Sequence, residues 1–105
     1  MWTWRRRWSG PGRPMKPRII NVKPRTIQFV PLNPNGTPRI DRSPIYMTYD
    51  EFEAYRLIFY EGLTQEEAAR RMGISRGTLW RCLENARRKI AIMLAENRNL
   101  IVTVE

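Results

Sequence analysis

A short segment from residue 75 to residue 81 gathers polar and basic side chains at helical spacing. They supply two guanidinium groups, two hydroxyls, one indole and one glycine. The residues are Ser75, Arg76, Gly77, Thr78, Trp80 and Arg81. Guanidinium groups bind phosphates and the acceptor edge of guanine, and a hydroxyl-capped helix start offers free N–H groups to a phosphate. The segment therefore predicts contacts with a polyanion.

The chain lacks the side chains on which most enzyme and metal sites depend. It has 105 residues, no histidine and one cysteine, Cys82. A zinc site needs four ligands, and histidine-based acid–base catalysis needs an imidazole. The sequence also contains no phosphate-binding loop and no nucleophile–base pair. We therefore expect a protein that is not an enzyme and has no metal or cofactor.

A second group of basic and aromatic residues lies at the N-terminus, where residues 1–8 read MWTWRRRW. Arginine in such arms enters narrow minor grooves, and tryptophan stacks on bases. The candidate contacts in the arm are Arg5, Arg6, Arg7, Arg13, Lys16 and Arg18. An interfacial membrane peptide has a similar composition. This arm has no apolar helical face and prolines follow it, so nucleic acid is favoured over a membrane.

The formal net charge of +9 belongs entirely to the first part of the chain. Residues 1–45 contain ten basic residues, one acidic residue and all eight prolines, whereas residues 46–105 contain nine residues of each sign. A basic excess favours a polyanionic partner. The division predicts that general affinity for nucleic acid comes chiefly from residues 1–45. Without an apolar run of membrane-spanning length, we expect a cytoplasmic, nucleoid-associated protein.

The proline-rich part cannot be helical, because proline removes an N–H donor and fixes φ. The expected divisions are a flexible basic arm at 1–18, an extended segment at 19–47, a helical domain at 48–97 and a C-terminal segment at 98–105. The expected strands are residues 19–22, 26–30 and 45–47, with an edge strand at 100–104. Asn35-Gly36 predicts a turn between them.

Three helices are expected in the second part of the chain. The start signals are the capping boxes Thr48-x-x-Glu51 and Thr64-x-x-Glu67, followed by Ser75. Gly62 and Gly73 are the stop signals of the first two helices, and the third helix runs to about Asn97. In the first helix, the apolar positions are Phe52, Tyr55, Ile58 and Phe59, whose spacing predicts one apolar side.

The second and third of these helices have the residue pattern of a helix-turn-helix. Counted from Gln65, the motif needs apolar residues at the fourth, eighth, tenth, fifteenth and eighteenth positions, a small fifth residue and a turn former at the ninth. The chain provides Ala68, Ala69, Met72, Gly73, Ile74, Leu79 and Cys82. An ordinary helical hairpin is the alternative, but the small residue and the turn match together. The third helix would enter a major groove by its first turn.

The third helix carries an apolar stripe beyond this motif. The stripe consists of Leu79, Leu83, Ala86, Ile90 and Met93, spaced four and three residues apart. The last two turns of this third helix extend past the first two helices. The sequence leaves two equal alternatives, packing of the N-terminal strands on these turns or a homodimer through the C-terminal part of the helix. The basic run 87–89 either follows phosphates or is a solvated face.

The helical part resembles an uncharacterised prokaryotic family, domain of unknown function one-three-four. The resemblance rests on residues 63–79, LTQEEAARRMGISRGTL, and extends to segments 13–19, 49–57 and 83–91. The same helices are similar to region four of bacterial sigma factors, in which the second and third helices bind promoter DNA. The resemblance implies DNA-facing positions at Ser75, Arg76, Thr78, Trp80 and Arg81.

These patterns predict a DNA-binding transcription regulator with double-stranded DNA as its partner. The expected fold is mainly α with small β, a winged or sigma region-four-like three-helix domain with a basic proline-rich arm, short strands and a C-terminal strand. One alternative is an architectural or RNA-associated protein that binds mostly through its arm. Another is a module that associates with RNA polymerase.

Overall fold

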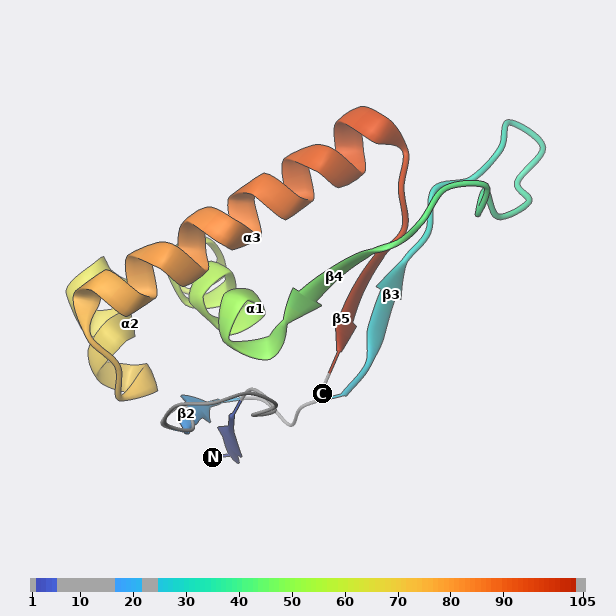
Figure 1. The fold of residues 1–105 in the computed structure, drawn as a ribbon. Coiled ribbons are helices and arrows are strands. Elements are labelled where there is room, and N and C mark those ends of the chain that lie inside the picture. Colours follow the sequence, from blue (N-terminus) through green and yellow to red (C-terminus); the bar gives the residue numbers. More distant parts are fainter. Residues whose placement is uncertain (1, 6–16, 22–24, 104–105) are drawn as a thin grey trace, which may run out of the picture.

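The computed structural model describes residues 2–5, 17–21 and 25–103 (Figure 1). Within these ranges the chain is mixed α/β, with three α-helices, one π-helical turn and five strands. In chain order they are β1 (Trp2–Trp4), β2 (Arg18–Ile20), β3 (Ile27–Phe29), β4 (Ile45–Thr48), α1 (Tyr49–Tyr55), η1 (Arg56–Tyr60), α2 (Gln65–Met72), α3 (Arg76–Glu96) and β5 (Leu100–Thr103). The long helix α3 spans the molecule and touches both the other helices and the larger sheet.

The helix boundaries lie where the capping signals predicted them. The carboxylate of Glu51 accepts a hydrogen bond from the Thr48 N–H at 3.0 Å, and that of Glu67 accepts one from the Thr64 N–H at 2.9 Å. The cap of α2 is Gly73, with φ +67°. The cap of α3 is Asn97, which adopts φ +53° although it carries a side chain. The predicted starts and stops of α2 and α3 are confirmed.

The C-terminal end of the first helix departs from the predicted periodicity. η1 contains a backbone hydrogen bond from Glu61 N to Arg56 O at 3.1 Å, which spans five residues instead of four. This wider turn removes the following side chains from the 3.6-residue repeat. Phe59, predicted on the apolar side, is consequently half exposed, and Tyr60 is exposed. The expectation for Phe59 is therefore wrong.

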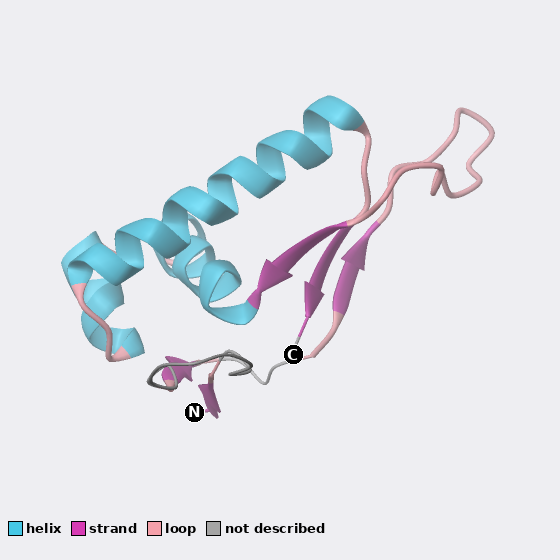
Figure 2. Ribbon diagram, viewed as in Figure 1, coloured by secondary structure: helices cyan, strands magenta, loops and turns pink. Residues whose placement is uncertain are grey.

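The larger sheet has the strand order β3-β5-β4 (Figure 2). β5 runs antiparallel to β3, with Phe29 opposite Leu100, and parallel to β4, with Ile45 opposite Leu100. The predicted edge position of the C-terminal strand is therefore wrong, because β5 is the central strand. Its buried residues Leu100 and Val102 alternate with half-buried ones, so one face of the strand packs into the core while both of its edges are hydrogen-bonded.

The smaller sheet pairs the two ends of the N-terminal arm. Trp2–Trp4 runs antiparallel to Arg18–Ile20, with Trp4 opposite Arg18. Trp4 is buried in the same hydrophobic cluster as Ile20. The prediction of a flexible arm at 1–18 is thus wrong for Trp2–Trp4 and Arg18, since burial of Trp4 and Ile20 holds the small sheet against the helical domain. The rest of β2 matches the strand predicted at 19–22.

Two hydrophobic clusters follow one another along α3. The first joins α1, α2 and the start of α3 through buried residues that include Leu57, Met72 and Leu79. The second joins α3 to the larger sheet, with Ile90 and Met93 packed against it. The later residues of the apolar stripe, Ala86, Ile90 and Met93, therefore pack on the larger sheet, where α3 contacts β4 and β5. The homodimer alternative stays a prediction.

Candidate functional site

The start of α3 is held by its junction with α2. Ala68, Ala69 and Met72 of α2 and Leu79 of α3 are all buried there. The small side chains of the two alanines allow the helices to pack closely. Gly73, in the left-handed conformation, redirects the chain between them. The residues matched above therefore form one rigid junction that fixes the direction of the α3 N-terminus.

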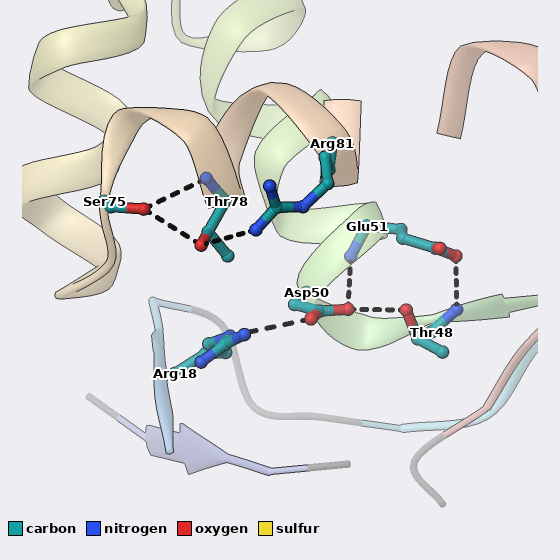
Figure 3. Close-up of polar contacts among 7 residues, drawn as sticks. All are labelled: Arg18, Thr48, Asp50, Glu51, Ser75, Thr78 and Arg81. Atoms are coloured by element: carbon teal, nitrogen blue, oxygen red, sulfur yellow. Dashed lines mark hydrogen bonds and ion pairs between the residues drawn. The ribbon is translucent and has the colours of Figure 1, made fainter. Parts of the chain in front are cut away.

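A chain of hydrogen bonds runs along the first turn of α3 (Figure 3). Ser75 Oγ accepts from the Thr78 N–H at 3.1 Å and donates to Thr78 Oγ1 at 2.9 Å. Arg81 Nη2 donates to the same Thr78 Oγ1 at 3.3 Å. These contacts hold the Arg81 guanidinium against the helix start. The structure thus brings Ser75, Thr78 and Arg81 into one polar cluster.

The other predicted residues of this turn lie beside that cluster on the exposed side of α3. Arg76 is exposed, and the Trp80 side chain, one helical turn further on, is 53% exposed. A Cβ added to Gly77 would meet no atom within 4 Å. Packing among the described residues therefore does not require a glycine at this position, although glycine costs about 1 kcal/mol in a helix relative to alanine.

The charges around α3 leave several cations unneutralised. Arg76, Arg81 and Arg88 are exposed and form no ion pair with any described residue. The acidic residues of α1, in contrast, are buried and paired. Their ion pairs are Arg18–Asp50 at 3.6 Å, Lys89–Glu51 at 2.6 Å and Arg56–Glu53 at 2.8 Å. Although residues 46–105 have no net charge, the exposed side of α3 is basic because these carboxylates are turned inward.

Arg18 requires a correction, since it was expected on the nucleic-acid-binding arm. Its side chain is only 10% exposed and pairs with the buried carboxylate of Asp50 (Figure 3). The neighbouring strand end is held too, because the Asn21 N–H donates to Glu53 Oε2 at 2.8 Å. A buried carboxylate needs a partner of opposite charge. Arg18 therefore anchors β2 to α1 rather than facing a ligand.

The remaining arm candidates are only partly described. Arg5, directly after β1, is exposed. The other predicted contacts, Arg6, Arg7, Arg13 and Lys16, lie outside the described residues. The geometry of the arm is therefore defined only at its two ends.

Phe59, expected on the apolar side of the first helix, is instead a surface residue beside α3. The Arg87 guanidinium lies over its ring, 5.1 Å from the centroid, and also pairs with Glu84 at 2.6 Å. Of the run 87–89, only Arg88 is left without an ion pair to a described residue. The adjacent aromatic residues Phe59 and Tyr60, just before the helix stop at Gly62, were the available signal for this exposed aromatic surface.

Cys82 is buried in the cluster that joins α1, α2 and the start of α3. Burial, followed by the nearby negative charge of Asp50, raises the pKa of its thiol to about 12. At neutral pH the residue is a protonated, apolar core side chain. Among the residues that the structure describes, no cluster of three or more His, Cys, Asp or Glu side chains could hold a metal ion.

None of the helices in the described part of the chain combines the length and apolar character needed to cross a membrane.

Comparison with known proteins finds relatives that share most of the length of this chain. It is 55% identical over 96 residues to a UPF0251 protein of Pyrococcus furiosus, covering 91% of this chain and 86% of that protein. A UPF0251 protein of Pyrococcus horikoshii is 58% identical over 83% of this chain and 77% of its own length. For one from Methanosarcina acetivorans the identity is 42%, over 83% and 75% respectively. No solved structure matches the chain significantly.

A family model covers residues 5–104, which include every described element except β1. This chain therefore belongs to the family described as protein of unknown function DUF134.

Proposed function

We propose that the protein is a DNA-binding transcription regulator in which α2 and α3 act as a helix-turn-helix. The observation that carries the proposal is the exposed face of the α3 start. Unneutralised Arg76 and Arg81 flank an open Gly77 there, on a helix end held rigidly by α2. A helix with this presentation fits the major groove of double-stranded DNA.

Each residue of this face has a proposed role. Ser75, Thr78 and Arg81, joined by hydrogen bonds, bind a backbone phosphate together with the free N–H groups of the helix start. Arg76 and Trp80 face the base edges. Gly77 lets the helix backbone approach the groove, which accounts for a glycine that packing does not require.

The small sheet β1–β2 supports a winged arrangement next to this face. Ile19 of β2 lies against the turn between α2 and α3, with its Cδ1 3.5 Å from where a Cβ on Gly73 would be. The sequence between the two strands is rich in arginine. We propose that this connection contacts the DNA backbone or minor groove beside α3. Burial of Trp4 and Arg18 argues against an alternative in which the whole arm binds independently.

Selection of bound fragments from random duplex DNA, followed by salt titration, tests the proposal. A regulator that makes roughly 6–10 phosphate contacts loses several decades of affinity between low and moderate salt. Replacing Arg76 or Arg81 by alanine is expected to weaken binding to the selected sequence by about 1–3 kcal/mol. Arg39→Ala is the matched control, because Arg39 is exposed and paired with Asp41 in the distant 31–44 connection. Equal affinity of all three variants for the selected sequence would refute the assignment of α3.

A further inference from the structure

Three consecutive basic residues in the middle of α3 differ in what they contact. The Lys89 ammonium lies 2.6 Å from the buried carboxylate of Glu51. The Arg87 guanidinium lies 2.6 Å from the carboxylate of Glu84. Arg88, between them, is exposed, and within the described part of the chain it has no ion-pair partner. Of the three cations, Arg88 is therefore the one whose charge is available to a ligand.

Arg88 lies on the same side of α3 as the candidate DNA-binding face. It follows Arg81 by seven residues, close to two turns of an α-helix, and Gly77 by eleven residues, close to three turns. The side chains of Arg81 and Arg88 therefore project in nearly the same direction. Leu79 and Ala86, which are buried, lie on the opposite side of the helix. The exposed basic side of α3 thus continues past its first turns.

The acidic residue of this part of α3 is already neutralised. Glu84 is the only acidic residue of the helix before its last residue, Glu96. Its carboxylate accepts a hydrogen bond from Arg87 Nη1 at 2.6 Å. The same guanidinium lies over the Phe59 ring, 5.1 Å from the centroid, and this second contact favours the paired position. A phosphate that approaches Arg88 therefore meets no uncompensated carboxylate on this part of the helix.

We propose that Arg88 binds a backbone phosphate of the DNA whose major groove receives the start of α3, an inference that rests on the proposed function. Arg88 follows Arg76 by twelve residues, which is about 18 Å along the helix axis. The major groove is only about 12 Å wide and 8.5 Å deep. When Arg76 lies at the base edges, Arg88 is consequently outside the groove, at the level of the phosphates that border it.

This position gives Arg88 a different role from that of Arg76. Contacts with phosphates position a protein on the duplex and add affinity, but they do not read the base sequence directly. Arg88 therefore contributes to affinity for any duplex, and its contribution depends on salt because binding to a phosphate releases counterions. Removal of Arg88 should weaken specific and non-specific binding alike.

Salt titration of the full chain on the selected duplex tests this contact. Arg88→Gln removes the charge and keeps a long polar side chain at an exposed helix position. The slope of log affinity against log salt concentration should become shallower by about 0.9, the value for one phosphate contact, while selection from random DNA should recover the same sequence. Arg39→Gln is the matched control, because Arg39 is exposed and paired with Asp41 in the distant 31–44 connection. Its slope should equal that of the wild type.

A gain of charge provides a second variant that does not depend on damage to the protein. Asn85 is exposed and lies one helical turn from both Arg81 and Arg88. Asn85→Arg should bind every duplex more tightly and steepen the salt slope. Gln28→Arg adds the same charge at an exposed position of β3 in the larger sheet and should leave the slope unchanged.

The possible results separate this contact from the proposed function. A wild-type slope in Arg88→Gln, or a changed sequence preference in that variant, would overturn the phosphate contact, even where Arg76→Ala still weakens binding to the selected sequence. If Arg88→Gln melts at a lower temperature than the wild type, Asn85→Arg decides, and an unchanged slope there also overturns the contact. A wild type that binds no duplex DNA would overturn the proposed function itself.

Discussion

The guanidinium of Arg18 lies 3.6 Å from the carboxylate of Asp50, and this pair joins strand β2 to the first turn of α1. The Asp50 side chain is 1% exposed, so its charge is almost fully removed from water. The pair links the N-terminal sheet, and with it the start of the arm, to the helices that carry the candidate site.

Removing one partner of this pair is expected to destabilise the protein strongly. Arg18→Met leaves the buried Asp50 carboxylate without its cationic partner, with only the hydrogen bonds from Thr48 and Glu51, which costs about 3–5 kcal/mol. Urea denaturation at pH 7 measures the loss. Arg39→Met, at an exposed pair in the 31–44 connection, should change stability by less than about 1 kcal/mol. The double variant Arg18→Met, Asp50→Leu should recover most of the loss, and failure to recover would show that Arg18 acts through something other than Asp50.

A substitution at Gly77 is expected to change stability and DNA binding in opposite directions. Gly77→Ala should raise the free energy of unfolding by about 1 kcal/mol, because alanine is the better helix former and its Cβ meets no atom. Under the proposed function, the same change should weaken binding to the selected DNA at least tenfold. Ala91→Gly, at an exposed position of the same helix, is the inverse control, with lower stability and unchanged binding. A variant at Gly77 that is more stable and binds as well as the wild type would contradict the close-approach role.

Trp80 is predicted to contribute to sequence preference rather than to folding. Its side chain is 53% exposed, so Trp80→Ala should change the unfolding free energy by less than about 1 kcal/mol. Binding to the selected sequence should fall, while binding to random duplex DNA should fall much less. The ratio of the two affinities is the measurement. Phe59→Ala, also at a half-exposed aromatic residue, serves for comparison, and an equal ratio in both variants would argue against base contact by Trp80.

The pKa of Cys82 predicts how stability changes in alkaline solution. Its value of about 12 in the folded protein lies above the ordinary value of about 8.5 that applies when the chain unfolds. The unfolded chain therefore loses this proton first, and the stabilising contribution is complete below about pH 8.5 and declines as the pH rises toward 12. Urea midpoints at pH 7 and pH 10 should diverge more in the wild type than in Cys82→Ala. In the folded protein at pH 8, iodoacetamide should leave Cys82 unmodified.

The features that the sequence predicted correctly are encoded within a few neighbouring residues. The capping box at Thr64 and Glu67 joins atoms three residues apart, and the hydroxyl of Ser75 caps α3 in the same way. Gly73 needs only its own backbone conformation to end α2. Such signals do not depend on the rest of the fold, so the exposed start of α3 could be located from sequence.

The features that the sequence missed depend on distant partners. In the sequence, nothing distinguishes Arg18 from the other arginines of the arm. Only the structure shows that it pairs with Asp50, which is far from it along the chain. β5 has the composition of an edge or a central strand, and only pairing with both β3 and β4 decides between them. Phe59 is exposed because the π-helical turn at Arg56–Tyr60 moves it away from the apolar side of the helix. The residue pattern carries no distinct signal for such a turn.

The central place of β5 has a consequence for the synthesis of the protein. β3 and β4 leave the ribosome well before β5, yet in the finished sheet each of them is hydrogen-bonded to β5 and they do not pair with one another. The larger sheet therefore cannot assemble until β5 has been translated. The junction of α2 and α3, complete by Cys82, can form while the chain is still growing. The molecule thus acquires its structure in two stages, and the emergence of β5 from the ribosome allows the second.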